Sequence, residues 1–165
     1  MQKRILSLLV DNTAGVLSRI SGLFSRRGYN IDSLTVGVTA DERFSRMTVV
    51  CSGDEMILEQ ITKQLAKLVD VRDIKVLEPE DSVSRELVLV KVAARAEQRQ
   101  GIISIADIFR AKVVDVSKDS LVVEMTGTKS KLEAFIDLMG SSEILELART
   151  GVTGLSRGAK DVRFL

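Results

Sequence analysis

A short acidic stretch around the only proline divides this chain of 165 residues into two halves of similar length. Pro79 stands within residues 78–82 (EPEDS), and a proline in such a polar run is typical of a linker. Each half is long enough for one unit of two packed layers. We therefore expect a first domain at residues 1–78, a linker at 79–84 and a second domain at 85–165.

The first half alternates between short apolar runs and apolar residues at helical spacing. Strands are expected at residues 4–10, 31–38, 44–51 and 71–77. The helix predicted after the first strand should end at Gly28, because glycine favours the position just past a helix. A second helix is expected to begin after Asp54. The predicted order of elements is β-α-β-β-α-β.

The second half predicts the same order. Its strands are expected at residues 86–92, 112–116, 121–125 and 143–148, with helices at residues 100–109 and after Thr128. The chain is therefore predicted to be α+β, with two ferredoxin-like βαββαβ domains. That architecture serves many unrelated functions, so the function has to be argued from a site.

The composition excludes several classes of function. Lys+Arg number 24 and Asp+Glu 23, so the net charge of +1 gives no excess of cations for nucleic-acid phosphates. Aromatic residues make up only 4%, which leaves few rings for base stacking. No apolar run approaches the length of a membrane-spanning helix. We expect a cytoplasmic protein that binds neither nucleic acid nor membranes.

The chain has no histidine and one cysteine, Cys51. The commonest general base and the commonest metal ligand are therefore missing, and no disulfide can form within the chain. A lone cysteine also fits a reducing compartment. We expect neither a metal nor a cofactor in this chain, and no catalytic activity of its own.

The loop between the first strand and the first helix predicts a binding site for an amino acid. Gly15 leaves space where the first free N–H groups of the helix point outward, and such groups bind a carboxylate. The amides of Asn12 and Asn30 suit an ammonium and a carboxylate together. Val16, Leu17 and Ile31 would supply apolar walls. The plainer alternative is that Asn12 or Thr13 caps the helix and Gly15 is merely small.

Longer segments around this loop resemble the small, regulatory subunits of acetolactate synthase, also called acetohydroxyacid synthase, which begin with an ACT domain. The segment most specific to that family is 28–36 (GYNIDSLTV). Further similar segments are 4–20 (RILSLLVDNTAGVLSRI), 45–48 (SRMT), 58–71 (LEQITKQLAKLVDV), 85–92 (RELVLVKV) and 151–158 (GVTGLSRG). The resemblance covers nearly the whole chain in order.

The resemblance implies a non-catalytic partner of a large subunit that carries thiamine diphosphate, Mg²⁺ and FAD. The small subunit would raise the activity of that large subunit and confer feedback inhibition by valine or another branched-chain amino acid. ACT domains pair side by side, so a homodimer through the first domain is expected, with the effector at the pair interface. The family's effector-contact positions fall on the six loop and strand residues Asn12, Gly15, Val16, Leu17, Asn30 and Ile31.

Two other classes of function stay open at this point. One is a free-standing ACT-type amino-acid sensor that regulates a different partner. The other is a purely structural dimerisation module, which would not explain the set formed by Asn12, Gly15 and Asn30. Residues 85–165 are expected to contact the large subunit. Within them, residues 154–158 (GLSRG) are either part of that contact or an exposed tail.

Overall fold

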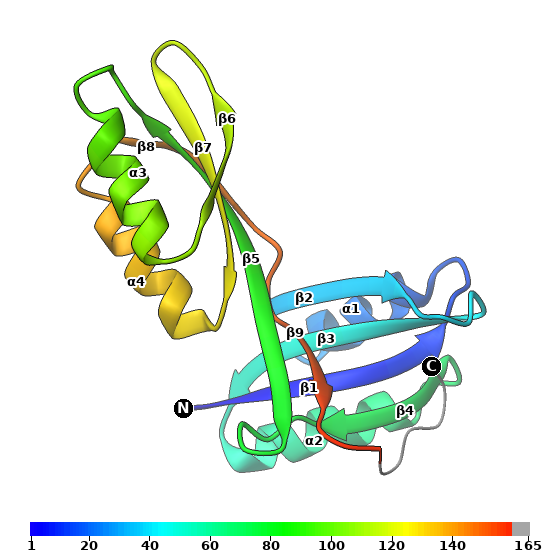
Figure 1. The fold of residues 1–165 in the computed structure, drawn as a ribbon. Helices are drawn as coiled ribbons and strands as arrows, with labels where there is room; N and C mark the ends of the chain where they lie inside the picture. The colour runs from blue at the N-terminus through cyan, green and yellow to red at the C-terminus, as the bar shows by residue number, and fades with distance from the viewer. Residues whose placement is uncertain (160–165) are drawn as a thin grey trace. The chain divides into compact units, whose positions relative to one another are not determined.

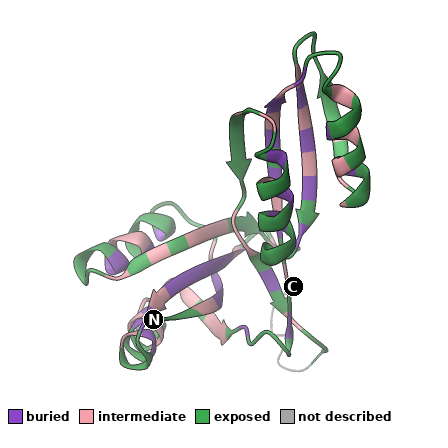
Figure 2. Cartoon of the chain, turned by 90° about the vertical axis from the view of Figure 1, so that its left-hand side faces the viewer, coloured by how far each residue is buried: buried purple, intermediate pink, exposed green. Residues whose placement is uncertain are grey.

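The computed structural model describes residues 1–159 and divides the chain into two compact units. Within the described residues, the first unit consists of Met1–Ser84 together with residues 152–159, and the second is Arg85–Gly151. In both units the buried residues lie on the strands and on the inner faces of the helices (Figure 2). Each unit therefore has a hydrophobic core of its own.

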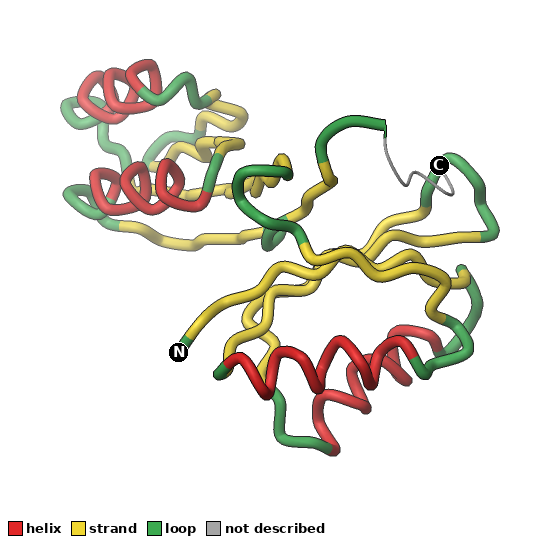
Figure 3. Tube along the Cα trace, turned by 90° about the horizontal axis from the view of Figure 1, so that it is seen from below, coloured by secondary structure: helices red, strands yellow, loops and turns green. Residues whose placement is uncertain are grey.

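The first unit follows the predicted order of elements (Figure 1). These elements are β1 (Gln2–Asp11), α1 (Val16–Arg26), β2 (Asn30–Val38), β3 (Phe44–Gly53), α2 (Glu55–Ala66) and β4 (Val71–Val76). The strands form an antiparallel sheet in the order β2-β3-β1-β4. Both helices cover the same face of that sheet (Figure 3). This is the predicted ferredoxin-like arrangement, which leaves β2 and β4 at the two edges.

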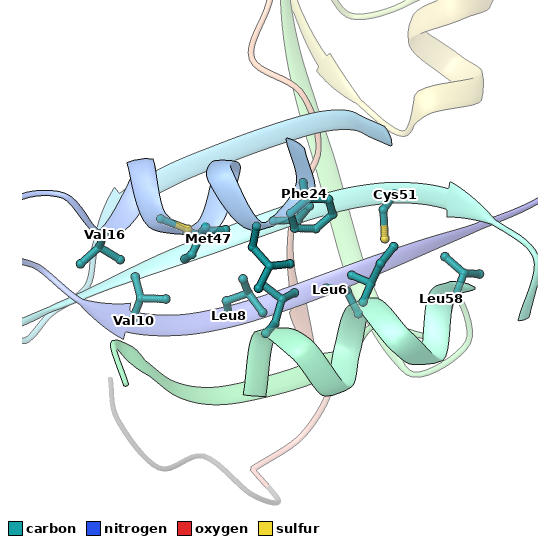
Figure 4. Close-up of a cluster of buried hydrophobic side chains, with 13 residues drawn as sticks. Leu6, Leu8, Val10, Val16, Phe24, Met47, Cys51 and Leu58 are labelled. Atoms are coloured by element: carbon teal, nitrogen blue, oxygen red, sulfur yellow. The ribbon is translucent and has the colours of Figure 1, made fainter. Parts of the chain in front are cut away.

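The core of the first unit lies between the sheet and its two helices (Figure 4). Successive side chains of a strand point to opposite faces, so Leu6, Leu8 and Val10 of β1 share the helix-covered face. They pack there against Phe24 of α1 and Leu58 of α2. All of these side chains are buried, and each contributes about 1.5–3 kcal/mol by leaving water. This face determines the register of the strands.

The helix ends follow the signals in the sequence. Gly28 has φ +67°, and the following Tyr29 N–H donates to the Phe24 carbonyl at 2.9 Å. This left-handed stop closes α1, as predicted. At the start of α2, the Asp54 carboxylate accepts a hydrogen bond from the Ile57 N–H at 2.8 Å. Asp54 is therefore a helix cap, and the predicted start of that helix is confirmed.

The second unit repeats this topology, as the sequence predicted. Its elements are β5 (Ser82–Ala93), α3 (Arg99–Ile108), β6 (Lys112–Val116), β7 (Ser120–Gly127), α4 (Lys129–Met139) and β8 (Ile144–Arg149). Its antiparallel strands are ordered β6-β7-β5-β8. Phe135 of α4 is fully buried and contacts Phe109 with ring centroids 5.5 Å apart. The fold class is thus α+β with two βαββαβ units.

The unit boundaries differ from the expected ones at two places. Strand β5 begins at Ser82 and crosses the boundary between the units at Ser84, so residues 82–84 are part of a strand and not of the linker expected at 79–84. Residues 152–159, expected within a second domain at 85–165, return to the first unit. There it forms β9 (Thr153–Ser156), which pairs with β5.

Hydrogen bonds explain why β9 lies on the first unit. The Gly154 N–H donates to the Thr48 hydroxyl at 3.3 Å, and the Thr35 hydroxyl donates to the Val152 carbonyl at 3.1 Å. Gly154 is buried, and a Cβ on it would lie 2.9 Å from the Leu77 side chain. A strand of four residues carries no clear alternation, so its partner could not be predicted. Residues 154–158 are therefore not a free tail.

Candidate functional site

The loop between β1 and α1 leaves the start of the helix without a side-chain cap. Gly15 occupies the cap position with φ +87°, and no side chain makes a capping hydrogen bond there. The Asn12 amide donates instead to the Glu42 carbonyl at 2.9 Å, and the Asn12 N–H donates to the Arg43 carbonyl at 2.8 Å. The capping alternative for Asn12 or Thr13 is therefore wrong. The Val16 N–H makes only a long hydrogen bond of 3.5 Å to the Thr13 carbonyl, and no side chain accepts from the first turn of the helix.

Gly15 is required at this position for two reasons. Its left-handed backbone is one that other residues rarely adopt. A Cβ on Gly15 would also lie 2.9 Å from Nη1 of Arg19, one helical turn further on. Any side chain at position 15 must therefore strain the backbone and displace the Arg19 guanidinium.

Two ion pairs lie close to the start of α1. The Arg19 guanidinium donates to both carboxylate oxygens of Asp70 at 2.6 and 3.1 Å. Arg72 pairs in the same way with Asp11, at 2.7 and 2.8 Å. Hydrogen bonding to Arg72 lowers the pKa of Asp11, and hydrogen bonding to Asp70 raises the pKa of Arg19. Both shifts favour the charged forms of Asp11 and Arg19.

The sequence-based argument missed Arg19 and Asp70. The spacing of four residues from Gly15 to Arg19 places both on one helical face, and this was the available signal. Asp70 is distant in sequence, and only the folded sheet brings it to the helix. Its carboxylate is largely buried, which makes the Arg19 partner necessary.

The two apolar residues at the start of α1 have different surroundings. The Val16 side chain is 3% exposed and belongs to the hydrophobic core. Its side chain therefore offers a ligand almost no surface, and its backbone N–H donates to the Thr13 carbonyl at 3.5 Å. Leu17 is 47% exposed, so its side chain is available as an apolar wall.

Asn30 and Ile31 lie at the other end of the sheet. Asn30 is opposite Ser52, close to the start of β1, whereas the end of β1 at Asp11 is opposite Phe44. The Asn30 side chain donates to the Asp32 carboxylate at 2.7 Å and is exposed. Ile31 is half-buried against the core. Both residues belong to the edge strand β2.

A single chain therefore does not bring the six predicted residues together. Asn12, Gly15, Val16 and Leu17 lie where α1 begins, and Asn30 and Ile31 lie beyond where it ends. The 11 residues of α1 span about 16 Å, which is more than one amino acid can bridge. Within one chain, each group can form only half of the predicted site.

Other kinds of chemistry have little support in residues 1–159. No group of three or more His, Cys, Asp and Glu side chains is placed to hold a metal ion in this part of the chain. Cys51 is buried, and burial raises the pKa of its thiol to about 11, so it stays protonated. No helix in the same range is long and apolar enough to cross a membrane.

Two family models match successive parts of the chain, and the second match continues past Gly151 into β9 of the first unit. Residues 6–73 match the family described as "AHAS small subunit-like ACT domain", and residues 85–158 match "Small subunit of acetolactate synthase". The acetolactate synthase small subunit of Mycolicibacterium smegmatis is 52% identical over 157 residues, which are 95% of this chain and 92% of that protein.

Two further relatives cover almost the whole chain. The acetolactate synthase isozyme 3 small subunit of Salmonella typhimurium is 49% identical over 162 residues, covering 98% of this chain and 99% of that protein. The crystal structure of the acetolactate synthase small subunit from Thermotoga maritima has a TM-score of 0.89 and 40% identity. It covers 96% of this chain and 99% of that one.

Proposed function

The chain belongs to the family of acetolactate synthase small subunits, and from that premise we propose that it activates a catalytic large subunit and makes it sensitive to valine. The condensation chemistry, with thiamine diphosphate, Mg²⁺ and FAD, belongs to the large subunit in this proposal. The present chain supplies the effector site in its first unit and contacts the large subunit through its second. Exposed apolar side chains such as Ile108, Val114 and Leu145 support that contact.

The separation of the two half-sites in one chain carries the proposal for the effector site. Strand β2 is an edge strand, and edge strands pair readily with another copy. If two β2 strands pair antiparallel about a two-fold axis, the Asn30 end of one lies beside the Val38 end of the other. The Val38 end is also where α1 begins, because Val38 is opposite Ser45 and Ser45 is opposite Val10. Pairing thus joins the two half-sites.

The joined half-sites suit a branched aliphatic amino acid. The uncapped start of α1 offers N–H groups to the carboxylate. The side-chain amides of Asn12 and Asn30 offer oxygens to the ammonium. Leu17 of one chain and Ile31 of its partner supply apolar surface for the valine side chain. Each homodimer would contain two such sites by symmetry.

The test combines a thermal-shift titration with valine and an activity assay with the large subunit. We expect valine to stabilise the parent chain by about 2.7 kcal/mol at one hundred times its Kd. Asn12→Ala and Asn30→Ala should each weaken valine binding about ten- to one hundredfold, because each removes a hydrogen bond to a charged group. Gly15→Asp should abolish it by adding bulk and a repelling charge. Thr13→Ala, in the same loop, is the control.

Stimulation of the large subunit should survive in all of these variants. A Gly15→Asp chain that remains fully inhibited by valine would disprove the effector site. A strictly monomeric mass by light scattering at micromolar concentration would disprove the paired arrangement. Co-purification with the large subunit distinguishes this proposal from a free-standing sensor, which would bind valine but not that subunit.

A further inference from the structure

The space beside Gly15 is occupied by the guanidinium group of Arg19. A Cβ built on Gly15 would have three atoms of this group as its nearest neighbours, with Nη1 at 2.9 Å, Cζ at 3.7 Å and Nη2 at 4.0 Å. Gly15 immediately precedes α1, and Arg19 lies about one helical turn further along the chain. The guanidinium therefore lies over the start of the helix, where a ligand that approaches Gly15 contacts it.

One carboxylate holds the Arg19 guanidinium in this position. Nε and Nη2 donate to the two carboxylate oxygens of Asp70, at 2.6 and 3.1 Å. The Asp70 side chain is only 10% exposed, and the Asp70 carbonyl accepts a hydrogen bond from the Asp11 N–H at 2.9 Å. Two parallel hydrogen bonds to one carboxylate fix the plane of a guanidinium as well as its position. The orientation of Nη1 is therefore fixed too.

Nη1 is the nitrogen that this pair does not use. It makes no hydrogen bond to any residue in the part of the chain that the structure describes. The Arg19 side chain is 49% exposed, so a ligand can reach it. A guanidinium has only donors, and each N–H of Nη1 therefore needs an acceptor from outside the chain. Two N–H groups of a fixed cation are available beside Gly15.

The two ion pairs near the start of α1 add no net charge. Arg72 pairs with Asp11 as Arg19 pairs with Asp70, so two guanidinium groups are matched by two carboxylates. These pairs do not attract anions over a long distance, because their charges cancel. Recognition by Nη1 depends instead on a short, directed hydrogen bond. Such a bond suits the carboxylate of a ligand whose other groups are bound nearby.

We propose that Arg19 is a further binding residue of the effector site and that its Nη1 donates to the carboxylate of the amino acid. This inference rests on the proposed function, which places the carboxylate at the start of α1. A hydrogen bond between a guanidinium and a carboxylate is charge-assisted and stronger than one to a neutral acceptor. The site therefore selects ligands with a free α-carboxylate and discriminates against the corresponding amides.

The test compares two ligands of the full chain by isothermal titration calorimetry. Valine and valinamide share the side chain and the ammonium, but valinamide has a neutral amide in place of the carboxylate. We expect the parent chain to bind valine about ten- to one hundredfold more tightly than valinamide, because only valine gives Arg19 a charged acceptor. Equal affinities for the two ligands would overturn the inference.

Two variants assign this preference to Arg19. Arg19→Met should weaken valine binding about ten- to one hundredfold and leave the affinity for valinamide unchanged. Arg19→Met also leaves the largely buried Asp70 carboxylate without its partner. The double variant Arg19→Met, Asp70→Asn removes both charges, which costs less stability than leaving one of them unpaired. It should show the same loss of preference, and a preference as large as in the parent chain would overturn the inference.

The pair of Arg149 and Glu86 in the second unit supplies a matched control. Nε and Nη2 of Arg149 donate to the two carboxylate oxygens of Glu86 at 2.8 and 3.1 Å, and the Glu86 side chain is 5% exposed. Arg149→Met therefore unpairs a buried carboxylate in the same way, but away from the effector site. It should keep the full preference for valine. An equal loss in Arg149→Met and Arg19→Met would reduce the effect to general destabilisation and overturn the inference.

The result for Arg19 is distinguishable from the result for the proposed function. A parent chain that does not bind valine would disprove the effector site itself. If the parent chain binds valine and Asn12→Ala weakens that binding, the effector site stands. Retention of the preference for valine over valinamide in the Arg19 variants would then disprove only the role of Arg19.

Discussion

The two units share one topology, yet they begin their first helices differently. In the first unit, left-handed Gly15 precedes α1, and the Asn12 side chain ties the loop to the Glu42 carbonyl. In the second unit, right-handed Gln98 precedes α3, and Arg99 donates to the Ser117 and Lys118 carbonyls. In both units a side chain thus holds this loop to the next hairpin. Neither helix start has a side-chain capping hydrogen bond, so the two starts differ in the left-handed backbone of Gly15 and in the residues that surround it.

The ends of the same two helices show the opposite relation. Gly28 after α1 and Arg110 after α3 both have left-handed backbones, with φ +67° and +56°. Each is followed by an N–H that closes the helix, from Tyr29 to the Phe24 carbonyl and from Ala111 to the Ala106 carbonyl. Both units therefore end their first helix with the same left-handed turn. This turn belongs to the shared topology, whereas the left-handed Gly15 before α1 is found only in the first unit.

The largest effects should come from the two buried phenylalanines. Phe24→Ala and Phe135→Ala should each destabilise their own unit by about 3–5 kcal/mol, because each leaves a cavity in a packed core. Only Phe24→Ala should also weaken the stabilisation by valine. Denaturant unfolding with and without valine measures both quantities. Equal losses of the valine response would contradict the separate roles of the units.

A smaller effect is expected where β9 joins the first unit. Gly154→Val should destabilise the chain by about 1–3 kcal/mol, because the added atoms meet Leu77 and the Val83 carbonyl. Leu155→Ala, at the exposed neighbouring position, should change the stability little. The measurement is urea unfolding of both variants. A stable Gly154→Val chain would show that β9 is not needed by the first unit.

The two left-handed helix ends should respond in opposite directions. Gly28→Ala should destabilise the first unit by about 1–2 kcal/mol, since only backbone strain is added and a Cβ meets no neighbour. Arg110→Gly should stabilise the second unit by about 1 kcal/mol or less, because relief of strain is partly offset by the entropy of glycine. Thermal melting of each variant tests this. Loss of stability in both would refute the shared geometry.

The smallest expected effect is on the stability of the chain at low pH. Hydrogen bonding to Arg43 lowers the pKa of Asp41 from 3.8 to about 2. A lowered folded-state pKa contributes stability above pH 3.8, and this contribution is lost as the pH falls through 2. Asp41→Asn should therefore lower the stability at pH 5 but not at pH 2. Urea unfolding at the two pH values measures the difference, with Glu42→Gln as a control. An equal loss at both values would exclude this pair as the cause.

The sequence alone predicted the elements and the topology of both units. The alternation and the helical spacing of apolar residues indicate which side chains face a core. Gly28 and Asp54 predict a helix end and a helix start, because glycine favours a left-handed stop and aspartate favours the cap position. The residues at the open start of α1 were also recognised, because a loop between a strand and a helix is a local feature. These properties depend on residues only a few positions apart, so the amino-acid sequence alone is enough to predict them.

Contacts between distant strands were decided only by the tertiary structure. The return of β9 to the first unit depends on Thr35, Thr48 and a close approach at Gly154, which no periodicity encodes. The Arg19–Asp70 pair joins α1 to a residue 51 positions away, which only the folded sheet brings to the helix. The six predicted effector residues form two groups at opposite ends of one sheet, because β2 and α1 extend between them.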